Sequence, residues 1–140
     1  MAAMIATLNR LSPQVWVTGQ VWPGHIADLR AAGFTWLVNH RPDAEEPGQP
    51  SAAEIEHAGA EAGLKVVHAP ACGLPDTAVV RATRDVLDAL QRDDKAVFFC
   101  RSGMRSAAAW AMAERLGGAE PGALRDAAAA AGYDLSGVPL

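Results

Sequence analysis

The chain has 140 residues, of which 50% are hydrophobic and 20% charged. This length closes one hydrophobic core, so we expect a single domain over residues 1–140. The 12 basic and 16 acidic residues give a net charge of −4. That balance excludes a broad cationic field, so we expect neither a nucleic-acid nor a membrane partner, and an anion site has to be local.

The first half of the chain predicts strands and helices in alternation. Ser51 followed by Glu54 is a capping box, three prolines within residues 40–50 indicate a loop, and β-branched or aromatic runs indicate the strands. In chain order the predicted elements are a strand over residues 15–18, a short helix between Pro23 and Gly33, a strand over residues 35–39, the loop over residues 40–50, and a helix from Ser51 to about Ala62.

The second half continues the alternation. Its elements are a strand over residues 64–69, a helix capped by Asp76 or Thr77, a buried strand over residues 95–99, an alanine-rich helix over residues 105–116 and a last helix over residues 124–131. Strands that alternate with helices favour parallel pairing. We therefore expect an α/β fold with a mostly parallel, four- to five-stranded sheet and helices on both faces.

Residues 100–106, Cys-Arg-Ser-Gly-Met-Arg-Ser, follow the last buried strand and lead into a helix. Ligands of such sheets bind at the carboxyl edge, where this segment lies. Gly103 permits a backbone turn that points successive N–H groups inward, and the following helix directs its positive end to the same place. The sequence therefore predicts a nucleophilic Cys100 thiolate in an anion cradle formed by Arg101, Ser102, Gly103, Met104 and Ser106.

Further candidates surround this cradle. Arg105 has the planar fork that binds tetrahedral oxyanions, and Ser106 is placed to donate a hydrogen bond to the thiolate or to a leaving sulfur. His40 and Arg41 follow the second strand and are candidate substrate ligands. Cys72 is a candidate second thiol, either as a sulfur acceptor or as a resolving cysteine.

The two cysteines, Cys72 and Cys100, lack metal-ligand spacing, so we expect no metal and no cofactor. A disulfide between them is an alternative, but so few cysteines favour a reduced, cytoplasmic setting. The start of the chain carries no basic segment before its apolar stretch, so we expect no signal peptide.

Two families resemble this chain. The segment Cys100-Arg-Ser-Gly-Met-Arg-Ser106 resembles the active loop of single-domain rhodaneses, which move sulfane sulfur through a cysteine persulfide. Other segments resemble the beta-lactamase-hydrolase-like phosphatase family, namely Trp16-Val-Thr-Gly-Gln20, Ala32-Gly-Phe34, Asn39-His-Arg-Pro-Asp-Ala-Glu45 and Ala131-Gly-Tyr-Asp-Leu135. The second resemblance implies a dual-specificity-phosphatase-like fold, with either phosphatase or sulfur-transfer activity.

The chain departs from the cysteine-phosphatase pattern in two ways. Four residues separate Cys100 from Arg105, where those phosphatases have five, and no acid stands at the general-acid position in residues 69–76. Asp43 is the candidate substitute for that acid. Because a thiolate leaving group needs no acid, we expect a sulfurtransferase that forms a Cys100 persulfide.

Two alternatives stay open. One is a phosphomonoester hydrolase with a phosphocysteine intermediate, and the other is a non-catalytic sensor of anions or redox state. The expected partner is a small anionic substrate, either a persulfide or a phosphorylated donor. A sulfurtransferase also needs a thiol acceptor.

Overall fold

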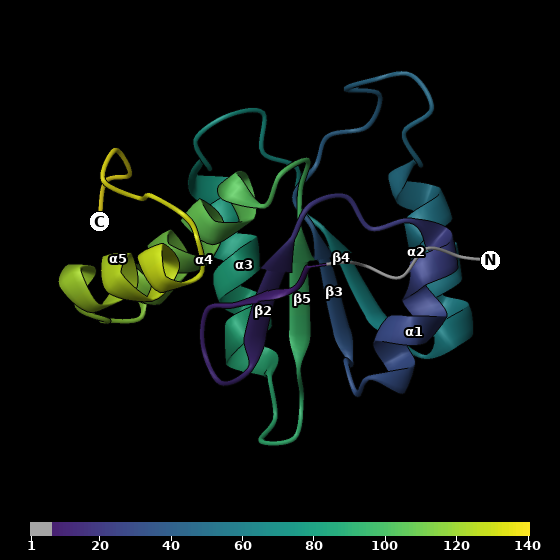
Figure 1. Ribbon diagram of the computed structural model, residues 1–140, viewed down its shortest axis with the longest axis horizontal. Helices are drawn as coiled ribbons and strands as arrows, with labels where there is room; N and C mark the ends of the chain where they lie inside the picture. Colours follow the sequence, from purple (N-terminus) through teal and green to yellow (C-terminus); the bar gives the residue numbers. More distant parts are fainter. Residues whose placement is uncertain (1–6) are drawn as a thin grey trace.

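The computed structural model describes residues 7–140 (Figure 1). Its strands are β1 (Asn9–Arg10), β2 (Val15–Thr18), β3 (Trp36–Asn39), β4 (Lys65–His68) and β5 (Ala96–Phe99). Its helices are the short 3₁₀ turn η1 (Pro23–His25) and α1 (Ile26–Ala31), α2 (Ala52–Ala62), α3 (Thr77–Ala89), α4 (Met104–Leu116) and α5 (Pro121–Ala130). The expectation about a signal peptide falls largely on residues 1–6, which lie outside the described residues.

The strands form one five-stranded sheet in the order β1-β2-β5-β3-β4. All neighbours run parallel except β1 and β2. The last residues of the parallel strands are in register, since Phe99 pairs with both Thr18 and Asn39, and Asn39 pairs with His68. The segments that follow these four strands therefore leave the sheet at one edge and lie near one another.

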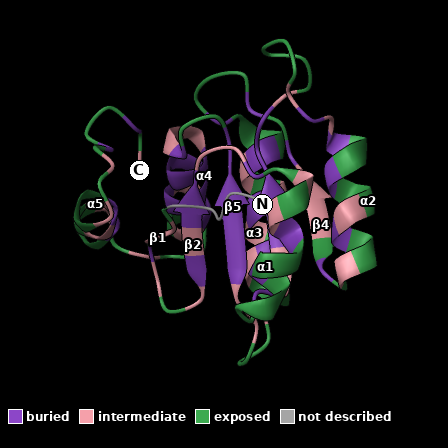
Figure 2. Ribbon diagram, turned by 45° about the vertical axis from the view of Figure 1, so that its right-hand side comes forward, coloured by how far each residue is buried: buried purple, intermediate pink, exposed green. Residues whose placement is uncertain are grey.

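Helices cover both faces of the sheet, as expected. In Figure 1, α1 and α2 lie on one side of the strands, and α3 and α4 lie on the other with α5 outside them. Alternate residues of β5 serve the two layers: Phe98 belongs to the cluster under α3 and α4, whereas Phe99 belongs to the cluster under α1 and α2. All four residues of β5 are buried, and Figure 2 shows this strand in the purple of buried residues. The α/β fold predicted from the alternation is confirmed.

Local signals placed most element ends correctly. The Ser51 hydroxyl accepts a hydrogen bond from Glu54 N at 3.1 Å, which completes the predicted capping box of α2. Asp76, and not Thr77, caps α3, because its Oδ1 accepts from Val79 N at 3.0 Å. Strand β1 was not predicted, because its two residues are too few to show a strand pattern. The predicted start of α5, at residue 124, is three residues late, although Pro121 suits the first turn of a helix.

No helix within residues 7–140 is long and apolar enough to cross a membrane. The same described residues contain no cluster of three or more histidine, cysteine, aspartate or glutamate side chains that could hold a metal ion.

Candidate active site

Cys100 lies directly after the central strand and is fully buried. Its sulfur accepts a hydrogen bond from Gly103 N at 3.1 Å. A backbone N–H that points at a sulfur stabilises the thiolate form, and the N-terminus of α4 begins immediately beyond it. The structure thus places Cys100 where the sequence analysis expects a nucleophile.

The cradle around this sulfur keeps unused hydrogen-bond donors. Besides Gly103, Met104 N donates to Ser102 Oγ at 3.3 Å. Within residues 7–140, the N–H groups of Arg101, Ser102 and Arg105 make no hydrogen bond to the protein. Several unpaired N–H groups around one point form a receptor for an oxyanion.

Gly103 is held in a conformation that other residues resist. Its φ is +96°, in the left-handed region. A Cβ at this position would meet the Tyr133 hydroxyl and would lie 3.0 Å from Val17 Cγ1. A second glycine also makes room for the cradle, because a Cβ on Gly19 would lie 2.9 Å from the Arg101 carbonyl oxygen. The shape of the cradle therefore depends on two glycines and on the close approach of Tyr133.

Arg105 is oriented by two acceptors. Its Nη1 donates to Glu45 Oε2 at 2.8 Å and to the Ala71 carbonyl oxygen at 2.6 Å, and its Nη2 donates to Glu45 Oε1 at 2.8 Å. A guanidinium has five N–H groups, so Nε–H and the second Nη2–H remain. The hydrogen bond from Arg105 to Glu45, and next the charge of Cys100, raise the pKa of Arg105. Glu45 therefore holds the guanidinium by its end and leaves its side edge open for an anion.

Glu45 itself lies between two guanidinium groups. Besides Arg105, it binds Nε of Arg41 at 2.9 Å. The hydrogen bond from Arg105, together with that from Arg41, lowers the pKa of Glu45 to about 2. Glu45 is not among the predicted site residues, although its position four residues after Arg41 was a usable signal for an ion pair.

Arg41 is not a substrate ligand, which corrects the sequence-based expectation. The residue is only 1% exposed. Its Nε binds Glu45, its Nη1 donates to Gln20 Oε1 at 2.8 Å, and its Nη2 donates to Glu46 Oε1 at 2.9 Å. The guanidinium is buried and held by three side-chain acceptors from this side of the sheet edge, so Arg41 supports Glu45 and the loop around it.

His40 is likewise not a substrate ligand, because it is fully buried and packs edge-on against Phe98. The Thr83 hydroxyl donates to the Val79 carbonyl at 2.8 Å, so its oxygen accepts from His40 Nε2 at 2.9 Å. Nδ1 then carries no proton and accepts from the Ser106 hydroxyl at 2.8 Å. Burial, followed by the charges of His68 and Arg105, lowers the pKa of His40 to about 3, which agrees with a neutral ring.

This network also changes the role of Ser106. The sequence analysis expects its hydroxyl to donate to the thiolate. The single hydroxyl proton is instead used by His40. Ser106 therefore anchors the first turn of α4 to the end of β3.

The remaining candidates lie around the cradle. The Arg101 side chain is 68% exposed and approaches Glu46 at 3.7 Å. Ser102 is exposed and Met104 half-buried. Asp43 is exposed, and its Oδ1 accepts from Ala52 N at 2.8 Å, which ties it to the start of α2.

Cys72 lies beside the Ala71 carbonyl that Arg105 binds, and its side chain is an exposed free thiol. Cys100 is also free, so the structure holds no disulfide between the two.

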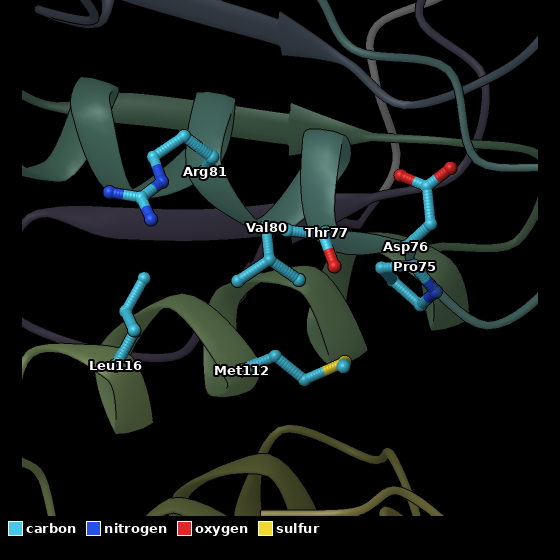
Figure 3. A pocket seen from close by; sticks show the side chains of 7 residues that line it. All are labelled: Pro75, Asp76, Thr77, Val80, Arg81, Met112 and Leu116. Carbon is cyan, nitrogen blue, oxygen red and sulfur yellow. The ribbon is translucent and has the colours of Figure 1, made fainter.

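A separate groove of about 420 Å³ lies between α3 and α4 (Figure 3). Its lining is mostly apolar and includes Val80, Met112 and Leu116. No residue of the cradle lines it. The groove is therefore distinct from the site around Cys100.

Several solved structures share this fold. A protein of Neisseria meningitidis Z2491, provisionally named a phosphatase, matches with a TM-score of 0.77 at 22% identity and covers 92% of this chain and 91% of its own. The active form of Tk-PTP matches with a TM-score of 0.70 at 20% identity, over 94% of this chain and 88% of its own. At this level of identity the likeness establishes the cysteine-phosphatase-like fold.

A curated relative is the beta-lactamase hydrolase-like protein of Agrobacterium fabrum strain C58, which is 29% identical over 110 residues. The match covers 78% of this chain and 25% of the relative. This chain therefore spans about a quarter of the length of that protein.

The comparisons contradict the expectation of a sulfurtransferase. That expectation depended on the four-residue spacing between Cys100 and Arg105 and on the missing acid. Residues 7–117, which include the whole cradle, match a family model described as the phosphatase-like domain of beta-lactamase hydrolase-like protein. The shorter spacing thus occurs within a phosphatase-like family and does not discriminate between the two chemistries. The chain belongs to the family of beta-lactamase hydrolase-like protein, phosphatase-like domain.

Proposed function

We propose that this protein is a cysteine-dependent phosphatase that hydrolyses a phosphate monoester or anhydride. The observation that carries the proposal is the geometry around Cys100, whose sulfur receives Gly103 N–H at 3.1 Å in a loop where the N–H groups of Arg101, Ser102 and Arg105 have no partner within residues 7–140. The phosphatase-like family and the fold of the structural relatives support it.

The first step is an in-line displacement at phosphorus. The Cys100 thiolate forms a P–S bond while the P–O bond to the leaving group breaks, and the leaving oxygen takes the bonding electrons. During this step negative charge spreads over the three equatorial oxygens of the transferring group. The free N–H groups of the cradle and the open edge of Arg105 are the donors that bind those oxygens.

The second step releases phosphate. Water attacks the phosphocysteine, a P–O bond forms and the P–S bond breaks, so the thiolate is regenerated together with dihydrogen phosphate. The same donors stabilise both steps, because both pass through a transition state with the same three equatorial oxygens.

Hydrolysis of para-nitrophenyl phosphate by the wild-type protein and by Cys100→Ser tests the proposal. A serine hydroxyl has nearly the same volume but stays protonated, so we expect kcat to fall by roughly a thousandfold or more with the fold intact. Circular dichroism and the urea midpoint serve as the control for folding. Turnover that survives in Cys100→Ser would reject a cysteine nucleophile.

A further inference from the structure

The acids at the carboxyl edge of the sheet limit the leaving groups that this site can release. A cysteine phosphatase with a general acid donates a proton to the departing oxygen. Residues 1–6 contain no acidic, histidine, cysteine or tyrosine side chain. Residues 7–140 therefore contain all the acidic, histidine, cysteine and tyrosine side chains of the sequence.

The loop between β3 and α2 supplies three carboxylates, and each is engaged. Asp43 accepts from Ala52 N at 2.8 Å. Glu45 is bound by two guanidinium groups, and Glu46 is bound by Arg41 at 2.9 Å and approached by Arg101 at 3.7 Å. Carboxylates that face guanidinium groups stay ionised at neutral pH and have no proton to give.

The other segments at this edge add two carboxylates. Asp76, in the connection between β4 and α3, caps Val79 N at 3.0 Å. Asp134, in the tail whose Tyr133 contacts the cradle, accepts from Ser136 N at 2.9 Å. The connection between β2 and η1 and the cradle itself contain no acidic residue. All five carboxylates of these segments thus act as caps or ion-pair partners, and Glu54 in the first turn of α2 belongs to the capping box with Ser51.

Three other protic side chains lie near the edge. His68 Nε2 lies 2.9 Å from the Arg41 carbonyl oxygen, so its proton is used there. The Tyr133 hydroxyl accepts from Asn9 Nδ2 at 3.1 Å and donates to the Ser102 carbonyl oxygen at 3.4 Å. Cys72 is exposed and free, and among residues 7–140 no hydrogen bond directs its thiol toward the cradle. The protons of His68 and Tyr133 are thus used by carbonyl oxygens, and nothing aims the Cys72 thiol at a leaving oxygen.

From this arrangement we infer that the protein acts on phosphate esters and anhydrides whose leaving group departs as a weakly basic anion, such as an aryl oxide or a phosphate. Alkyl phosphates are excluded, because an alkoxide does not depart without a proton. The inference rests on the proposed phosphatase function. It adds a substrate class that follows from the engaged carboxylates.

A series of leaving groups tests the inference. The substrates are aryl phosphates that range from para-nitrophenyl phosphate to phenyl phosphate, one alkyl phosphate and inorganic pyrophosphate. We expect kcat/KM to fall by about a hundredfold or more from para-nitrophenyl to phenyl phosphate, since a general acid that removed this dependence would contribute about 10²–10⁴. Pyrophosphate should be hydrolysed and the alkyl phosphate should not.

Two variants test whether a single side chain supplies the acid. Asp43→Asn and Cys72→Ala should leave the dependence of kcat/KM on the leaving group unchanged, and a flatter dependence in the wild-type protein than in either variant would identify that residue as an acid. Turnover that needs Cys100 but varies less than about tenfold across the aryl series would overturn the inference and leave the phosphatase proposal standing. No turnover of any substrate would overturn the phosphatase proposal, and the inference with it.

Discussion

The loop after β5 and the loop after β3 lie at the same edge of the sheet, but they differ in how many of their polar groups are hydrogen-bonded. In the first, the N–H groups of Arg101, Ser102 and Arg105 have no hydrogen-bond partner in the part of the chain that the structure describes. In the second, the charged side chains are paired: Arg41 donates to three side-chain acceptors, and one of them, Glu45, also binds Arg105. A loop with unused donors can bind an anion, whereas a loop with paired donors can only position its neighbour.

The largest effect is expected where the two loops meet, at Arg105. An Arg105→Lys variant keeps the charge but loses the fork that binds Glu45 at one edge and leaves the other edge open. We expect kcat/KM for para-nitrophenyl phosphate to fall by roughly 10²–10³. The matched control is Arg101→Lys, because that side chain is 68% exposed and should tolerate the change. An unchanged kcat/KM in Arg105→Lys would mean that charge alone serves the site, and similar losses in both variants would mean that the fork held by Glu45 is not specifically required.

The next effect concerns stability and tests the buried network behind the second loop. The pKa of His40 is about 3 in the folded protein against 6.5 for an ordinary histidine. Between these values the unfolded chain binds a proton that the folded chain does not. The contribution of neutral His40 to the free energy of unfolding is therefore complete above pH 6.5 and is lost as the pH falls toward 3. We expect the free energy of unfolding to fall by about 1.4 kcal/mol per pH unit below pH 6.5.

Urea unfolding at several pH values between 6.5 and 4.5 measures this loss. The corresponding window of Glu45 lies lower, because its pKa moves from 4.5 to about 2. A His40→Asn variant should therefore be less stable at neutral pH but should show a smaller slope above pH 4.5. A variant with the wild-type slope would show that another group carries the proton uptake.

The smallest expected effect separates the two neighbouring glutamates. Glu45→Gln removes the charge that orients Arg105, so we expect kcat/KM to fall by about tenfold through misplacement of the guanidinium. Glu46→Gln changes only contacts with Arg41 and the exposed Arg101 and should stay within about threefold of wild type. Steady-state kinetics on one substrate compares the two. Equal losses of kcat/KM in the two variants would mean that Glu45 contributes no more to activity than Glu46, and that its contact with Arg105 has no special role.

The sequence predicted the parts of this molecule that local patterns encode. The capping box at Ser51 and Glu54, the strand before Cys100 and the glycine at position 103 each depend on residues that are close in the chain. These were enough to predict the α/β order of most elements, the mostly parallel sheet and the position of the loop between β5 and α4.

The pairings within the site could not be predicted in this way, because they join distant segments. His40 finds Ser106 across 66 residues and Thr83 across 43, and Glu45 finds Arg105 across 60. A sequence pattern shows that these residues reach one edge of the sheet, but it does not show which donor meets which acceptor. For that reason His40 and Arg41 were interpreted as ligands when they are supports.

The contact between Tyr133 and the back of Gly103 bears on where the folding unit ends. The matched family region covers residues 7–117, yet Tyr133 lies beyond it, as do the buried side chains of Leu124, Leu135 and Val138. A fragment cut after residue 117 would uncover the apolar surface beneath α5 and remove the hydroxyl that bonds Asn9 and Ser102. The region that matches the family model thus ends at residue 117, whereas the folded domain continues through residues 118–140, the last 23 of the sequence.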